Sequence, residues 1–331
     1  MGVLACLAAG FEIVARHPAI ILMPLLLDLF LWLGPRLSLA PIFMALEQFF
    51  TTFWTAGTAT MPEAQQMAQL LSQTFNELAV RYNLFTVLSP APLFGAPTIM
   101  AAQLTVERPM GVRSEIVVAS PIVAFGWIVL LIIVGFGMNA LYLRVIGRQV
   151  NTETESALPG PQSFLPLWGG LIVLALIVLF ISGILMLTGF SIAALASLLS
   201  MGVAFFILTL FFALATFVVF HLIFAIPGMV QLRRSPLRAI QESVLLTRGD
   251  FVSISFLLLL ILVVSQGFNV VWSLPDPATW SNLIGIAGHA FVSTALIATL
   301  FVFYQDRLNF LPTAQKARAP QEIPAHSLMG D

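Results

Sequence analysis

Three ionisable side chains, Asp28, His221 and His289, lie in stretches of sequence that are otherwise apolar. A charged group inside a lipid bilayer is costly, so such residues usually face the protein interior and form proton relays, ion pathways or buried pairs. A carboxyl group beside an imidazole can transfer a proton, hold a polar ligand or fix how two helices align. Chemistry in this chain is therefore expected first at these three positions.

Spacing from arginine places two of these residues at a similar depth. Asp28 follows Arg16 by 12 residues, and His221 precedes Arg233 by 12. With a helical rise of ~1.5 Å per residue, each lies roughly 18 Å from an arginine that marks the inner membrane surface. We expect one polar cluster of Asp28, His221 and Asn139, because Asn139 falls near the same depth. A second polar layer nearer the outside is expected from Gln266, Asn269 and His289.

Three interpretations of these polar residues stay open: a structural role in helix packing, a proton or ion relay, and a ligand site. A metal site is not expected, because the histidines lack the HExxH spacing and Cys6 is the only cysteine. The sequence also lacks GxSxG, GxxxxGK, and a GxGxxG followed by its acidic partner. It therefore predicts no catalytic site, no bound metal and no cofactor.

Composition explains why so few residues stand out. Hydrophobic residues make up 59% of the 331 residues and charged residues 9%, and the mean hydropathy is +1.00. A soluble domain is nearer ~25% charged, so this composition is that of an integral membrane protein. The 14 lysines and arginines are balanced by 15 acidic residues, for a net charge of −1. Such a balance leaves no basic surface for nucleic acid.

The elements that must position the polar residues are apolar helices. A membrane-spanning helix needs about 20 apolar residues, and six stretches meet this length: residues 18–39, 116–145, 165–187, 192–226, 251–272 and 280–304. We predict an all-α, polytopic membrane protein with six transmembrane helices and additional interfacial amphipathic helices, one of them over residues 2–15. Residues 1–311 form a single membrane domain in this prediction, and residues 312–331 form a disordered cytoplasmic tail.

Residues 40–115 form the one sizeable part outside the predicted spans. Apolar and polar residues recur with a helical period over residues 61–83, which predicts an amphipathic helix. Residues 84–104 are apolar but broken by Pro90, Pro92, Gly95 and Pro97, so a straight span is excluded. A re-entrant segment buried in protein and a packed lid on the outer surface both fit this pattern.

The distribution of cations predicts that both termini are cytoplasmic, because cytoplasmic connections carry more lysine and arginine than external ones. Residues 231–250 contain four arginines, whereas the short connections at residues 188–191 and 275–279 contain no cation. With the N-terminus inside, residues 40–115 are extracytoplasmic. Ten of the 14 cations are then cytoplasmic, and four are external: Arg36, Arg81, Arg108 and Arg113.

A cytoplasmic amphipathic helix is predicted over residues 236–248. Ser235 can cap it, Pro236 suits its first position, and Gly249 suits its end. Arg248 in its last turn has two candidate partners, anionic lipid and the Asp306 carboxylate after the last span.

Short motifs resemble a known family. Residues 236–251 read PLRAIQESVLLTRGDF, residues 301–310 read FVFYQDRLNF, and the opening ARHPAIILMPLLL is similar too. The matching positions in the first two motifs are Ala239, Ser243, Arg248, Tyr304, Asp306 and Arg307. This pattern resembles a large family of multi-pass bacterial membrane proteins, some with the membrane domain that accompanies glycerophosphodiester phosphodiesterases. The resemblance implies a six-span protein of the bacterial plasma membrane without a known activity. The phosphodiesterase barrel and its metal site have no counterpart here, so that activity is not implied.

The leading interpretation is a non-enzymatic membrane protein with an envelope or membrane-organising role. Its expected partners are membrane lipids, with residues 40–115 and the cytoplasmic helix as the candidate surfaces for a protein partner. A small-molecule or ion transporter that uses Asp28 is the second interpretation, and a continuous polar cavity around Asp28 would favour it. An intramembrane enzyme is the third. The helix, arginine and proline before the first span resemble the helix and arginine before the fifth, which hints at two related halves.

Overall fold

The computed structural model describes residues 1–58, 62–89, 96–103, 107–111, 113–154 and 161–308. These residues are almost entirely helical. The first part of the chain contains α1 (Val3–Arg16), η1 (Pro18–Ile21), α2 (Leu22–Leu33), α3 (Ala40–Thr58), α4 (Pro62–Arg81), η2 (Leu84–Leu88), α5 (Met100–Gln103) and α6 (Pro121–Glu153). The second part contains α7 (Phe164–Ser197), α8 (Met201–Leu222), α9 (Ala225–Leu232), α10 (Pro236–Gly249), α11 (Phe251–Trp272) and α12 (Asn282–Arg307). Two short parallel strands, β1 (Arg36–Ser38) and β2 (Glu115–Val117), pair with Leu37 opposite Ile116.

Five helical segments of the described chain are long and apolar enough to cross a membrane. They are α6, α7, α8 continued by α9, α11 and α12. A sixth candidate is α1 together with the η1–α2 segment, a pair that is bent by 91° at its break. The predicted all-α fold with several membrane spans is therefore confirmed, and the chain is a multi-pass helical membrane protein.

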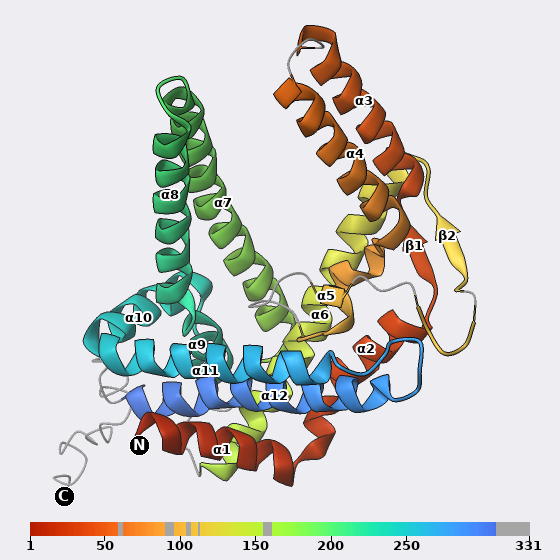
Figure 1. The fold of residues 1–331 in the computed structure, drawn as a ribbon. Coiled ribbons are helices and arrows are strands. Elements are labelled where there is room, and N and C mark those ends of the chain that lie inside the picture. The colour runs from red at the N-terminus through yellow and green to blue at the C-terminus, as the bar shows by residue number, and fades with distance from the viewer. Residues whose placement is uncertain (59–61, 90–95, 104–106, 112, 155–160, 309–331) are drawn as a thin grey trace, which may run out of the picture.

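Two helical hairpins rise from a layer of helices (Figure 1). The layer consists of α1, α12 and α11 lying side by side, with α12 between the other two. The α3–α4 hairpin and the α7–α8 hairpin extend away from this layer on the same side. The candidate spans consequently do not run as one parallel bundle, because α7 and α8 rise across the direction of α11 and α12.

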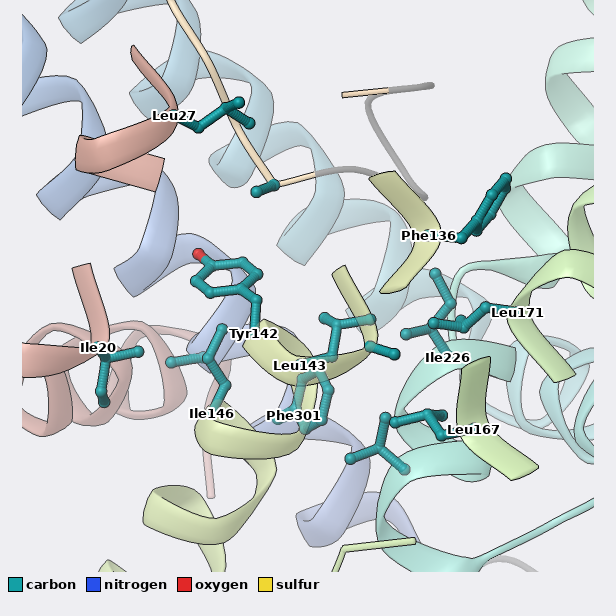
Figure 2. Packing of buried hydrophobic residues seen from close by; sticks show 14 of the residues in the cluster. Ile20, Leu27, Phe136, Tyr142, Leu143, Ile146, Leu167, Leu171, Ile226 and Phe301 are labelled. Carbon is teal, nitrogen blue, oxygen red and sulfur yellow. The ribbon is translucent and has the colours of Figure 1, made fainter. Parts of the chain in front are cut away.

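The apolar core is built around α6, which passes between α12 and α7 (Figure 2). Tyr142 of α6 is buried, and its hydroxyl group donates to Thr294 Oγ1 of α12 at 2.9 Å. Buried side chains of α7, α9 and α12 gather around the same stretch of α6: Leu167, Leu171, Ile226 and Phe301. Gly147 lets α9 come close, because a Cβ atom there would lie 2.6 Å from Val230 Cγ1.

The first predicted span, residues 18–39, is shorter than expected. Helix α2 ends at Leu33, and the chain then enters strand β1. The sequence Gly34-Pro35 explains this end, because proline disfavours helical geometry at the residue before it. The 12 residues of α2 span only ~18 Å, whereas the hydrocarbon layer is ~30 Å thick.

Helix α1, which was predicted to lie in the membrane interface, packs along α12. Cys6, Ile13 and Val14 of α1 are buried, and Phe11 meets Phe291 of α12 edge to face with ring centroids 6.0 Å apart. At Gly10 the two backbones nearly touch, because an added Cβ atom would lie 2.7 Å from the carbonyl oxygen of Ala295. The apolar face of α1 is thus covered by protein along its length.

The turn between the third and fourth predicted spans also lies elsewhere. It was expected at residues 188–191, but α7 continues to Ser197 and the turn falls at residues 198–200. The polar residues that suggested a turn fit within the helix instead. Ser191 donates its hydroxyl proton to the Leu187 carbonyl at 2.8 Å, and Gly189 makes room for Phe211 of α8.

Residues 40–115, the segment predicted to be extracytoplasmic, begin with a helical hairpin of α3 and α4. The amphipathic helix expected over residues 61–83 is present as α4, whereas α3 was not predicted. Two arginines near β2 satisfy carbonyl groups at the end of α2: Arg108 binds Leu33 O at 2.7 Å, and Arg113 binds Gly34 O at 2.9 Å. Arg36 does the same for α4 by donating to Ala79 O at 2.5 Å. Burial lowers the pKa of Arg113, and the neighbouring charges of Arg108 and Arg36 lower it further.

Candidate functional site

Asp28 is fully buried in α2 and holds the broken segment that follows η2. Its two carboxylate oxygens accept hydrogen bonds from the backbone N–H groups of Ile99 at 3.3 Å and Met100 at 3.0 Å. These donors stand at the start of the single-turn helix α5, where no intrahelical acceptor exists. The carboxylate therefore fastens the segment before α5 to α2, which is a structural use of this residue.

His221 lies at the end of α8 and makes contacts of its own. Its Nδ1 is 2.9 Å from the Phe217 carbonyl oxygen, and its ring stacks at a tilt on Phe217 with centroids 4.2 Å apart. In Figure 1 this end of α8 and helix α2 lie on opposite sides of the molecule. The predicted cluster of Asp28, His221 and Asn139 is therefore not formed, although Asn139 is buried within α6. Equal distance from an arginine indicates depth, but it does not indicate which helices are neighbours.

The predicted second layer is not formed either. His289 of α12 is partly buried and lies 3.3 Å from the Ser293 hydroxyl of its own helix. Gln266 on α11 is exposed, and Asn269 is half-buried. An uncharged polar residue in a long apolar helix can face lipid near one end, so residue type alone did not identify a buried layer.

Ser243 binds the backbone at the break between helices α8 and α9. This hydroxyl group comes from α10 and donates to the His221 carbonyl at 2.6 Å. It also accepts a hydrogen bond from the Phe224 N–H at 3.2 Å. Ser243 is fully buried. One side chain thereby satisfies two backbone groups that the break removes from the helical ladder.

The ion pairs near the end of α12 differ from the expected one. Arg307 pairs with Asp250, at the α10–α11 junction, at 2.8 Å and with Asp306 at 3.1 Å. The guanidinium group also lies 4.9 Å from the ring centre of Phe303. Arg248, by contrast, is exposed in the last turn of α10. Of the two candidate partners of Arg248, Asp306 is therefore not the one that it binds; Arg307 pairs with Asp250, which directly follows the end of α10.

Tyr304 belongs to a buried polar group that the sequence did not reveal as a cluster. Its side chain is fully buried, and its hydroxyl oxygen would lie 3.0 Å from a Cβ atom at Gly228. Nearby, Arg234 Nε pairs with the Glu242 carboxylate at 3.0 Å, across the turn between α9 and α10. Gln231 is fully buried in the same turn of α9, and among the described residues neither of its amide atoms has a hydrogen-bond partner. The only sequence signal was a glutamine at the end of an apolar run.

A cavity of about 590 Å³ lies between η2, α6 and α7. Its lining is mainly aliphatic and aromatic, with Ile132 and Phe136 from α6 and Ile172 from α7. Among the described residues that line it, the polar side chains are the hydroxyl groups of Tyr82, Thr86, Ser89 and Ser182, and Asp28 is not one of these lining residues. A continuous polar cavity around Asp28 would favour transport. This cavity is mainly apolar and is not lined by Asp28, so it does not support that interpretation.

In the part of the chain that the structure describes, no three His, Cys, Asp or Glu side chains lie close enough together to hold a metal ion. No family model matches the chain, and comparisons with curated proteins and with solved structures find no significant similarity. The resemblance of the motifs at residues 236–251 and 301–310 to a bacterial family therefore stays a prediction.

Proposed function

We propose that this chain is a non-enzymatic protein of a bacterial plasma membrane that organises the lipid around it. The surface of the α7–α8 hairpin carries this proposal. Residues 161–231 contain no Asp, Glu, Lys or Arg, and both helices expose large apolar side chains along their length, among them Leu179, Leu195, Phe206 and Phe212. A soluble monomer rarely exposes an apolar patch beyond a few hundred Å². Lipid is the environment that covers such a surface on all sides.

The charged residues support an orientation with both termini in the cytoplasm. Charged residues lie in and beside the helix layer from which the α7–α8 hairpin rises: Arg16, at the end of α1, pairs with Glu153 at 2.8 Å, and Arg234, between α9 and α10, pairs with Glu242. The turn at residues 198–200, at the far end of the α7–α8 hairpin, carries no charge. Residues 231–250, between α9 and α11, contain four arginines against two acidic residues, and such an excess of cations is the pattern of a cytoplasmic side.

The segment after α4 supports a re-entrant interpretation of residues 84–104. The Leu88 carbonyl packs directly on α6, because a Cβ atom at Gly135 would lie 2.5 Å from it. Gly135 lies within the apolar part of α6. Irregular backbone is tolerated at membrane depth only when protein covers it, and Leu84 and Leu88 are both buried. Residues 90–95 and 104 of this segment lie outside the described residues.

Extraction in native lipid discs tests the proposed role. The protein is cut from the membrane with its surrounding lipid by an amphipathic polymer, and the lipids are compared with those of the whole membrane. Enrichment of particular lipids is the expected result. A disc composition identical to that of the bulk membrane would contradict a lipid-organising role. A cysteine introduced at Gln65 in a Cys6→Ser background tests the orientation, since labelling only from the cytoplasmic side would overturn it.

A further inference from the structure

We propose that the cavity between η2, α6 and α7 binds an acyl chain of a membrane lipid. This inference deepens the proposed lipid-organising function and rests on it. The argument uses the chemistry of the lining, the state of its hydroxyl groups and the way the cavity meets the outer surface of α7.

The lining excludes a charged or strongly polar occupant. None of the lining residues that the structure describes is Asp, Glu, Lys, Arg or His. An ion or a charged solute would lose its hydration there without gaining a partner, which is costly in an apolar environment. The aliphatic and aromatic walls match a hydrocarbon chain, because burying each methylene group from water or a polar interface is favourable.

Two of the cavity's hydroxyl groups are already used. Thr86 Oγ1 donates to the Asn83 carbonyl at 2.8 Å, and Ser89 Oγ donates to the Ala96 carbonyl at 2.7 Å. Their protons bind the protein's own backbone and are not offered to a ligand. These two hydroxyls therefore shape the broken segment, and the hydroxyls of Tyr82 and Ser182 are the remaining polar groups among the described lining residues.

The cavity is continuous with the surface that faces lipid. Leu176 and Leu179 both line it, yet they are 59% and 69% exposed on α7. Because α7 is a candidate span, a chain can enter sideways from the bilayer without crossing a polar barrier. The volume of about 590 Å³ also falls within the range of roughly 300–1,000 Å³ that is typical of ligand pockets.

Photocrosslinking with a phospholipid that carries a diazirine in its acyl chain tests the site. The full chain is reconstituted in vesicles of this lipid and irradiated, and labelled peptides are mapped. Labelling is expected in both walls, at residues 82–89 and 172–182. Ala175→Phe fills the cavity from α7, and we expect labelling of residues 82–89 to fall about tenfold, the effect of displacing roughly two methylene groups.

Matched variants keep the test specific. Ala194 is exposed on the same helix and does not line the cavity, so Ala194→Phe should leave the labelling of residues 82–89 unchanged. Labelling of α8 serves as the internal standard for lipid contact. If Ala175→Phe impairs folding, Ser182→Asp is compared with Ser191→Asp, since only the first puts a charge in the cavity wall. It should lower labelling of residues 82–89 in the same way.

The outcomes distinguish failure of the acyl-chain site from failure of the proposed lipid-organising function. Unchanged labelling of residues 82–89 in both cavity variants overturns the acyl-chain site, as does labelling confined to the outer surfaces of α7 and α8. If lipid enrichment in native discs persists in that case, the lipid-organising function stands without the cavity. If enrichment is absent while the cavity is labelled, the function fails and a plain lipid contact is left. A second phospholipid carries its diazirine in the headgroup. If this probe labels residues 82–89 and the acyl-chain probe does not, the acyl-chain site is also contradicted.

Discussion

Replacing Ser243 by alanine should destabilise the protein at the break between α8 and α9. The serine hydroxyl donates to His221 O and accepts from Phe224 N–H, and the site is fully buried. Alanine removes both contacts and leaves a carbonyl and an N–H group without a partner. Each buried unsatisfied group costs about 1–3 kcal/mol. We expect Ser243→Ala to lower the free energy of unfolding by about 2–4 kcal/mol, allowing for some relaxation of the break.

Ser191→Ala is the matched control. Ser191 is exposed on α7, and its hydroxyl bonds the Leu187 carbonyl of its own helix. Removing that bond exposes no buried group, so the change should stay within about 0.5 kcal/mol. Both variants are compared by equilibrium unfolding of the purified protein in mixed micelles, with helicity followed by circular dichroism.

Hydrogen exchange supplies a second, local measurement. In Ser243→Ala the Phe224 amide should exchange faster than in the parent protein, because its acceptor is gone. In Ser191→Ala its exchange should be unchanged. If Ser243→Ala costs no more than Ser191→Ala, and the Phe224 amide keeps its protection, the reasoning about this break is refuted.

Three further predictions follow from individual contacts. Asp28→Ala and His221→Ala should each destabilise, and their effects should add within about 0.5 kcal/mol because they share no partner; a larger coupling in the double variant would restore the predicted pair. Gly10→Ala should cost about 1–3 kcal/mol because its Cβ would meet the α12 backbone, whereas Gly183→Ala, with nothing within 4 Å, should not destabilise; thermal unfolding of both variants decides. Arg307→Asp should lower folded yield and Asp250→Arg should restore it in part, while Arg248→Asp changes little; equal damage from Arg248→Asp would return that residue to the network.

Hydrophobic length and helical period predicted the helices well, because both reflect local chemistry. The helical period of apolar and polar side chains over residues 61–83 predicted an amphipathic helix, and α4 forms there. The same reasoning misplaced the end of α7, since Thr188 and Ser191 are polar but compatible with a helix in lipid. A hydroxyl that bonds back to the preceding turn conceals its polarity from the bilayer.

Asp28, Asn139 and His221 are buried as predicted, but their partners were not predicted. Asp28 is indeed buried, yet it binds the backbone of Ile99 and Met100, about 70 residues along the chain. Its partner groups are peptide N–H groups, which exist at every residue and leave no trace in the sequence. The buried Gln231 was missed for a related reason, because one amide in an apolar helix has no pattern. Partner choice depends on which helices pack together, and depth alone does not determine that.

A single arginine placed at two depths of the α7–α8 hairpin tests the central claim most directly. Phe212 lies in the middle of α8 and Leu199 lies at the turn, and both are largely exposed, at 67% and 88%. If the hairpin crosses the bilayer, Phe212→Arg puts a charge near its centre at a cost of about 2.5–3.5 kcal/mol. Membrane-integrated yield, measured by alkaline extraction, should then fall roughly 100-fold in the insertion equilibrium, while Leu199→Arg should have little effect. Equal tolerance of the two variants would contradict a lipid-embedded hairpin.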